Sequence, residues 1–282
     1  MGIALGTSAT QLKVGAGTVS RVYKGSTAFW DSDAAAYTAA VEAADGQSLE
    51  LGVVAAYHNF ILGCKADGIW DAIKAACLLC GARTLAGALV PLVGTAPTNN
   101  NFVDADYNRE TGLKGNGSTK YLDSNRANNA DGQNDNHQSA FLSSVDTRYA
   151  SPIGMGYLGA SNAASTSRTT LGPYANVLYV GNMCSSQAIS SASASASGFL
   201  ASSRASSSGY SIRSGGSDFS KSVASVSPGG QNHFVFGDNA AGSPASITDA
   251  RLAFYSIGES ISDLAAFDAR VTALVTAIGA AL

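Results

Sequence analysis

The sequence has 282 residues, of which 45% are hydrophobic and only 13% charged, and its formal net charge is −3. A chain of this length can bury one large core, which excludes two full-sized domains. Its 17 Lys and Arg residues are scattered, so counterion release could contribute little to binding, and nucleic acid is excluded as a main partner.

The start of the chain lacks the basic segment and the continuous apolar run of a secretory signal. Gly6 stands where a myristoylation signal needs Ser or Thr. The longest apolar run, Leu85 to Val93, has about half the length that spans a bilayer. These features predict a soluble protein made in a cytoplasm, without membrane insertion.

Residues 1–31 are predicted to form a small β-module. Short apolar alternations are interrupted by glycines until Phe29-Trp30, which is the pattern of short strands joined by tight turns. An exposed β-edge pairs readily with a neighbouring chain. The module could therefore attach the protein to a partner subunit by strand addition.

Residues 32–83 carry apolar side chains at helical spacing. The first helix is expected from a cap at Ser32-Asp33 to Asp45-Gly46, and the second from Ser48 to Asp67-Gly68. A third helix is expected before Gly81, because several apolar residues share one helical face. They are Ile69, Ile73, Ala76, Cys77 and Cys80.

The four cysteines are too few for a disulfide scaffold in a chain of this length. We expect them to be small buried hydrophobic residues. Cys77 and Cys80 would need two further ligands to bind zinc, yet the three histidines stand alone without ligand spacing. No metal or other cofactor is expected.

Residues 84–282 show short apolar stretches separated by Gly, Asn, Ser and Pro, a pattern that predicts an antiparallel sandwich or jelly roll. Residues 185–208 are nearly all Ser and Ala, and edge strand or mobile loop is expected there. The expected strands are Leu85–Val93, Thr119–Leu122, Ser139–Val145, Val177–Val180, Ser197–Leu200, Tyr210–Arg213, His233–Gly237 and Arg251–Ile257.

A final helix is predicted after Ser260-Ile-Ser-Asp263, which has the form of a capping box. Its apolar residues alternate at steps of three and four, which suits packing on a sheet or a short coiled-coil seam in a homotrimer. Packing on the sheet is favoured, because two heptads are marginal for an independent coil. The apolar residues are Leu264, Phe267, Val271, Leu274 and Ile278.

Two motifs suggest enzymatic chemistry but are incomplete. The run from Gly112 to Lys120 resembles a phosphate loop, but Ser118 stands where Lys must follow the second glycine, and a Gly-rich hairpin turn is expected instead. Ser211 lacks the second glycine of a nucleophile elbow. Since the acidic residues of the β-region lie at turn positions, no glycosidase pair stands out, and we expect no enzyme.

The Asn-rich stretch Asn125 to Asn136 could supply oxygen ligands for calcium, or amide hydrogen bonds to sugar hydroxyls. No Glu follows at the distance that an EF-hand requires. We therefore expect a polar loop.

The run Val19-Ser-Arg-Val-Tyr-Lys-Gly-Ser-Thr-Ala-Phe-Trp30 resembles a β-module, V-x-x-V-Y-x-G-x-T-x-V-W, of many tailed-phage virion proteins. Residues 40–46, 63–74, 81–92 and 107–122 are similar to uncharacterised phage structural proteins. Residues 250–258 and the helix after them resemble the end of their concanavalin-like, or laminin-G-like, jelly roll. The resemblance implies an attachment module in which Val22, Tyr23, Gly25 and Trp30 contribute to assembly, and it transfers no catalytic residue or metal ligand.

The expected architecture is mainly β, with a β-module at 1–31, a helical segment at 32–83, and a jelly-roll sandwich with a C-terminal helix at 84–282. The resemblance implies a virion structural protein, and we expect a tail-fibre, tail-tip or baseplate component whose lectin-like sandwich faces the host. Expected partners are other virion proteins, further copies of the chain, and host-surface glycan. The candidate glycan contacts are Tyr107, Tyr121, Tyr149 and Tyr157.

Two alternatives remain open. The protein could be a capsid decoration, or cement, protein that clamps neighbouring shell subunits and has no sugar ligand. It could also be a depolymerase that acts on host glycans.

Overall fold

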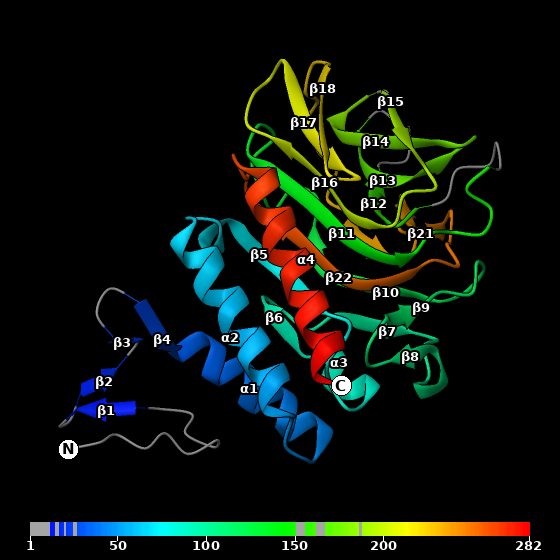
Figure 1. Ribbon diagram of the computed structural model, residues 1–282. Helices are drawn as coiled ribbons and strands as arrows, with labels where there is room; N and C mark the ends of the chain where they lie inside the picture. The colour runs from blue at the N-terminus through cyan, green and yellow to red at the C-terminus, as the bar shows by residue number, and fades with distance from the viewer. Residues whose placement is uncertain are drawn as a thin grey trace.

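The computed structural model describes residues 12–14, 17–19, 21–24, 27–150, 156–161, 167–185 and 188–282. Two nine-stranded sheets pack face to face, and helices cover the outer face of one of them (Figure 1). The predicted class, mainly β with a sandwich and a C-terminal helix, is confirmed.

The sheet beneath the helices, here the helix-covered sheet, is entirely antiparallel. Its strands in spatial order are β18 (Ser217–Ser222), β17 (Gly209–Ser214), β16 (Gly198–Arg204), β11 (Asn136–Ser144), β22 (Arg251–Gly258), β5 (Ile73–Leu78) and β6 (Pro91–Val93), with β9 (Gly112–Lys114) and β8 (Tyr107–Asn108) beside β22.

The opposite sheet is antiparallel except where β12 pairs with β20. Its strands in spatial order are β15 (Ala188–Ser193), β14 (Val177–Cys184), β13 (Arg168–Tyr174), β12 (Leu158–Ser161), β19 (Asn232–Val235), β10 (Tyr121–Ala127) and β7 (Thr98–Asn100), with β20 (Asp238–Ala240) and β21 (Ser243–Ala245) attached to β12.

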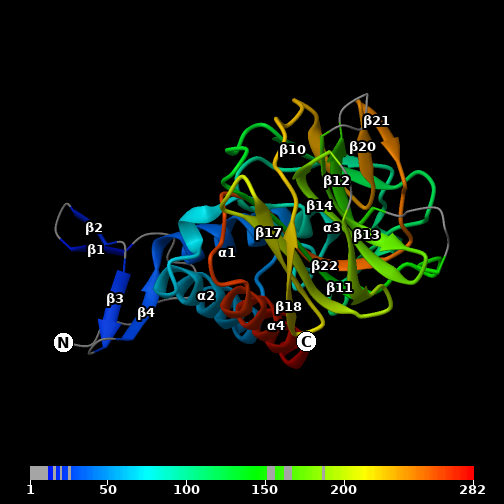
Figure 2. The ribbon, with the colours of Figure 1, turned by 90° about the horizontal axis from the view of Figure 1, so that it is seen from above.

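Three helices, α1 (Ser32–Asp45), α2 (Leu51–Ala66) and α4 (Leu264–Ala281), lie together on one side of the sandwich (Figures 1 and 2). Aromatic rings fix this layer to the sheet. The ring centroid of Phe267 lies 5.3 Å from that of Phe199 and 6.0 Å from that of Phe254. The Phe254 ring also contacts the ring of Phe60 in α2. The C-terminal helix therefore packs on the sheet, as its spacing predicted.

Among the described residues, α4 alone is long enough and apolar enough to span a membrane. Of its residues, 33% are buried inside the fold. Its five predicted apolar residues, Leu264, Phe267, Val271, Leu274 and Ile278, are all buried. They belong to the same core as Tyr57 and Ile61 of α2. The apolar face of α4 is thus used in internal packing.

A second core fills the space between the two sheets. Because side chains alternate across a strand, each strand sends every second residue into it. Leu142 and Leu252 enter from the helix-covered sheet, and Leu158, Val180 and Val235 enter from the opposite sheet.

The N-terminal residues form two hairpins. Strand β1 (Leu12–Val14) pairs with β2 (Gly17–Val19), and β3 (Arg21–Lys24) pairs with β4 (Thr27–Asp31), with Val22 opposite Trp30. Strand β4 leads directly into α1, whose N-cap is Asp31 rather than the expected Ser32-Asp33. Trp30 is 5% exposed. The side chains of Val22 and Tyr23, and the whole of Gly25, lie outside the described residues.

The predicted third helix is wrong. A short 3-10 turn, η1 (Trp70–Ala72), is followed by strand β5. Side chains of β5 alternate between two cores: Ile73, Ala76 and Leu78 face the helices, whereas Ala75 and Cys77 face the sandwich interior. A strand buried on both faces is a continuous apolar run, in which a helical face can be found by chance. Residues 73–78 thus belong to the sandwich.

The predicted strand Leu85–Val93 is also wrong in its first half. Residues Leu85–Ala88 form a short helix, α3, and only Pro91–Val93 is strand. The Thr84 hydroxyl caps α3 by accepting a hydrogen bond from the Gly87 N–H. The Asp45 carboxylate accepts from the Arg83 and Thr84 N–H groups at 2.7 and 2.9 Å. These polar contacts bend the chain where the apolar run suggested extension.

Two further expectations need correction. Residues 112–120 form a turn but not a hairpin, because β9 belongs to the helix-covered sheet and β10 to the opposite one. The Asn116 side chain makes this turn by accepting from the N–H groups of Ser118 and Thr119. Within residues 185–208, β15 is an edge strand as expected, but β16 is internal, and Phe199 supplies apolar packing.

Candidate functional site

The four tyrosines proposed as glycan contacts do not form one site. Tyr157 is 1% exposed, so its expected glycan contact is wrong: it supplies apolar volume to the sandwich interior. Tyr107 is half-buried and donates its hydroxyl hydrogen to the Ala82 carbonyl at 2.8 Å. Tyr121 lies on the opposite sheet, with its ring 4.6 Å from that of Phe234. Tyr149 is half-buried in the segment after β11.

Several acidic residues of the β-region make contacts within the fold. Asp146 is buried and accepts hydrogen bonds from Arg148, Thr248 and the Asp249 N–H. Burial alone would raise the pKa of Asp146, but these hydrogen bonds bring it below its usual value. Other such contacts are Asp106 with Lys120, Asp123 with Asn232, Asp131 with Arg126, Asp135 with Ser260, Asp218 with Arg213, and Asp249 with Thr147.

Nothing in the described ranges groups three His, Cys, Asp or Glu side chains around a possible metal ion. In the Asn-rich stretch, Asp131 pairs with Arg126, and the Asn128 and Asn136 side chains are buried. All four cysteines are buried and free, as predicted. Burial raises the pKa of Cys77 and Cys80 to about 12, so they stay protonated at neutral pH.

Two of the histidines are structural. His137 is buried with Nδ1 2.6 Å from the Glu259 carbonyl oxygen and Nε2 2.9 Å from the Ser256 hydroxyl. Burial lowers the pKa of His137 to about 4 and that of His233 to about 3. Neither side chain is placed to exchange a proton with a ligand at neutral pH.

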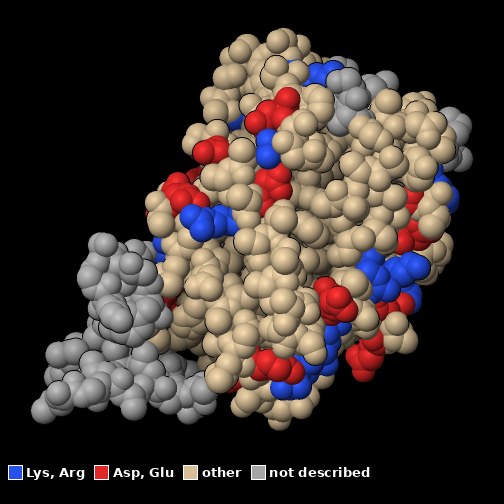
Figure 3. Space-filling model, viewed as in Figure 1, with Lys and Arg blue, Asp and Glu red and all other residues tan. Residues whose placement is uncertain are grey.

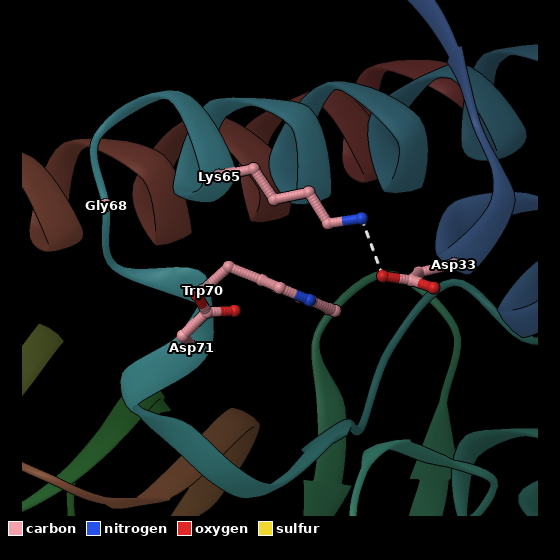
Figure 4. A pocket seen from close by; sticks show the side chains of 5 residues that line it. All are labelled: Asp33, Lys65, Gly68, Trp70 and Asp71. Carbon is pink, nitrogen blue, oxygen red and sulfur yellow. Dashed lines mark hydrogen bonds and ion pairs between the residues drawn. The ribbon is translucent and has the colours of Figure 1, made fainter. Parts of the chain in front are cut away.

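A pocket of about 300 Å³ lies where the start of α1 meets the end of α2 (Figure 4). Gly68 makes the turn after α2 with a φ of 71°, which strongly favours glycine, and η1 begins at Trp70. The pocket is lined by Asp33, Lys65, Gly68, Trp70 and Asp71.

Lys65 organises one side of this pocket. Its ammonium group donates to Asp31 Oδ1 and Oδ2 at 2.7 and 2.8 Å, and to Asp33 Oδ2 at 2.6 Å. These contacts engage all three hydrogens of the group. The Asp31 carboxylate also accepts from the N–H groups of Asp33 and Ala34, so the same residue caps α1 and holds α2. Burial opposes ionisation of Asp31, but these partners lower its pKa.

The Trp70 indole lies below Lys65, with the ammonium nitrogen 5.5 Å from the ring centroid (Figure 4). The indole is only half-buried, and the exposed carboxylates of Asp33 and Asp71 stand on either side of it. An aromatic surface can pack against the C–H face of a sugar, while carboxylates accept hydrogen bonds from its hydroxyls. The pocket therefore offers apolar contact and polar acceptors together.

Sequence reasoning missed this pocket. Trp70 was assigned to a third helix, and Lys65 is 34 residues from Asp31, so nothing local indicated their contact. The turn signal Asp67-Gly68 directly before Ile69-Trp70 was the available clue, since a tryptophan after a turn can remain partly exposed.

Charge on the molecular surface is sparse and mixed. On the face shown in Figure 3, blue and red residues stand next to each other among uncharged ones. Ion pairs in the structure include Lys74 with Glu259 and Arg270 with Asp67. This face has no basic surface of the kind that tracks a phosphate backbone.

No family model and no curated protein matches the sequence. Three similar solved structures are NanB sialidase from Streptococcus pneumoniae (12% identity, TM-score 0.41, 54% of this chain), the botulinum neurotoxin serotype D binding domain (8%, 0.49, 72%), and the CBM40 of Ruminococcus gnavus IT-sialidase bound to alpha2,3 sialyllactose (13%, 0.34, 52%). The matches cover 26%, 50% and 83% of those chains, so this chain spans about half or less of the first two.

Proposed function

We propose that this protein is a non-catalytic structural component of a tailed-phage virion that contacts host-surface glycan through the Trp70 pocket. The observation that carries the glycan contact is the half-exposed Trp70 indole between the Asp33 and Asp71 carboxylates. Aromatic side chains with a few fixed polar groups are the usual means of holding a small polar ligand.

The virion assignment is supported by the run Val19 to Trp30, which resembles the attachment module of tailed-phage proteins and lies in the β2 to β4 segment. In this proposal the N-terminal hairpins attach to a neighbouring virion protein, the chain assembles as a homo-oligomer, and the particle position is tail fibre, tail tip or baseplate. The protein would be made in the bacterial host cytoplasm.

Antibody-labelled electron microscopy of the intact particle tests its position. Label on the tail is the expected result, whereas label on the head would replace this proposal with capsid decoration. Incubation with host polysaccharide is expected to release no reducing ends, and their release would instead establish a depolymerase.

Replacing Trp70 with Ala is expected to weaken binding to host envelope polysaccharide by about 30-fold or more, the scale of a central aromatic contact. Titration calorimetry with the intact protein measures this change. Trp70→Phe keeps an aromatic surface and is expected to lose less affinity than Trp70→Ala.

The matched control is Tyr179→Ala, which removes a half-buried aromatic from β14 of the opposite sheet. It is expected to leave affinity unchanged, and thermal melts establish that each variant is folded. If Trp70→Ala binds as tightly as the unaltered protein, the Trp70 pocket is not the glycan site.

A further inference from the structure

We infer that the Trp70 pocket selects glycans that carry a protonated amine over glycans that carry carboxylates. This inference rests on the proposed function and specifies its ligand class. The Lys65 ammonium group bonds the carboxylates of Asp31 and Asp33, and the Asp71 carboxylate also lines the pocket, so acidic groups outnumber basic ones among these side chains.

Lys65 is not available to an anionic ligand. Its three ammonium hydrogens already bond Asp31 and Asp33 at 2.6 to 2.8 Å, and its side chain is 11% exposed. An acidic sugar would have to displace one of these carboxylates from Lys65. The carboxylate of Asp31, which is 1% exposed, would then lose hydrogen bonds from Lys65 while remaining buried.

Two further cations among the described side chains, Arg270 and Lys74, are also paired. Arg270 donates to the Asp67 carboxylate at 2.7 and 3.1 Å, and Lys74 lies 3.1 Å from Glu259. Asp71, in contrast, is exposed and has no ion pair within the described ranges of the chain. The charged groups left for a ligand are therefore anionic: the Asp71 carboxylate and the Asp33 oxygen that Lys65 does not bind.

Trp70 favours the same ligand class. The face of an indole attracts cations, and Lys65 already lies within 5.5 Å of its centroid. A sugar amine at the open side of the pocket would meet the Asp71 carboxylate and part of the indole face, while the C–H groups of the sugar pack on the rest of that face. An acidic group in the same place would be repelled by Asp33 and Asp71.

The test compares three oligosaccharides on the intact protein: a β-1,4-linked glucosamine oligomer, its fully N-acetylated counterpart of equal length, and an oligogalacturonate. At low salt the amine-bearing oligomer is expected to bind about 3- to 5-fold more tightly than its acetylated counterpart, which is the scale of exposed charge pairs. This advantage is expected to fall to about 2-fold or less in 0.5 M salt, because salt screens exposed charges. The oligogalacturonate is expected to bind more weakly than either.

Asp71→Asn is expected to weaken binding of the amine-bearing oligomer more than binding of the acetylated one, so that the preference for the amine is lost. Asp104→Asn is the matched control, because Asp104 is an exposed acid in η2 (Asp104–Asp106), outside the pocket, and it should change neither value. If host polysaccharide binds in a Trp70-dependent manner but the amine gives no advantage, or Asp71→Asn retains it, the inference fails and the proposed function stands. If Trp70→Ala alters no binding at all, the proposed function fails.

Discussion

Lowering the pH from 7 to 4 is expected to reduce the free energy of unfolding by about 3 kcal/mol for each of the two buried histidines. Burial lowers the pKa of His137 to about 4 and that of His233 to about 3, whereas an unfolded chain has histidines of pKa near ~6.5. Below that value the unfolded chain takes up protons that the folded protein excludes. The stabilisation is therefore fully present above pH ~6.5 and is lost progressively as the pH falls toward 4.

Denaturant unfolding at several pH values measures this loss, and His137→Gln and His233→Gln separate the two contributions. In each variant the free energy of unfolding is expected to fall less between pH 6.5 and 4 than in the unaltered protein. Protonation of carboxylates with lowered pKa values, such as Asp146 and Asp135, also lowers the free energy of unfolding. This loss begins only below their pKa in the unfolded chain, which is about 4. A stability that stays constant from pH 6.5 to 4.5 would show that neither histidine is buried in its neutral form.

Elements with one buried face were predictable from the sequence. Helix α4 keeps its apolar residues at steps of three and four, and the structure buries all five of them. Strand β17 alternates Tyr210 and Ile212, which are buried, with Ser211, which is exposed. In both elements the periodicity is visible because the other face meets solvent.

Elements buried on both faces were not predictable in this way. Strand β5 sends alternate residues into two different cores, so its run of apolar residues shows no strand period. The Trp70 pocket was missed for a related reason. Tyr157, a predicted glycan contact, fills the sandwich interior, whereas the position of Trp70 depends on contacts among α1, α2 and η1 that no local pattern encodes.

Replacing Arg204 with Met is expected to lower the free energy of unfolding by about 3 kcal/mol, although Met retains much of the apolar stem. Arg204 is 0% exposed, and among the described residues no carboxylate accepts a hydrogen bond from it. It donates instead to backbone carbonyls of four residues at 2.9 to 3.3 Å: Asn182, Ser206, Gly209 and Val223. Its guanidinium also lies 5.0 Å from the Tyr210 ring centroid.

The loss is expected because Met donates no hydrogen bond, so the buried Asn182 carbonyl loses its side-chain donor and the segments after β16 and β18 lose a common anchor. Arg270→Met is the matched control: Arg270 pairs with Asp67 at the surface, where such pairs contribute about 0–1 kcal/mol. Urea unfolding of the three proteins gives the comparison. Equal losses for the two variants would mean that the desolvation cost of Arg204 cancels its hydrogen bonds, and that apolar packing alone holds this end of the sandwich together.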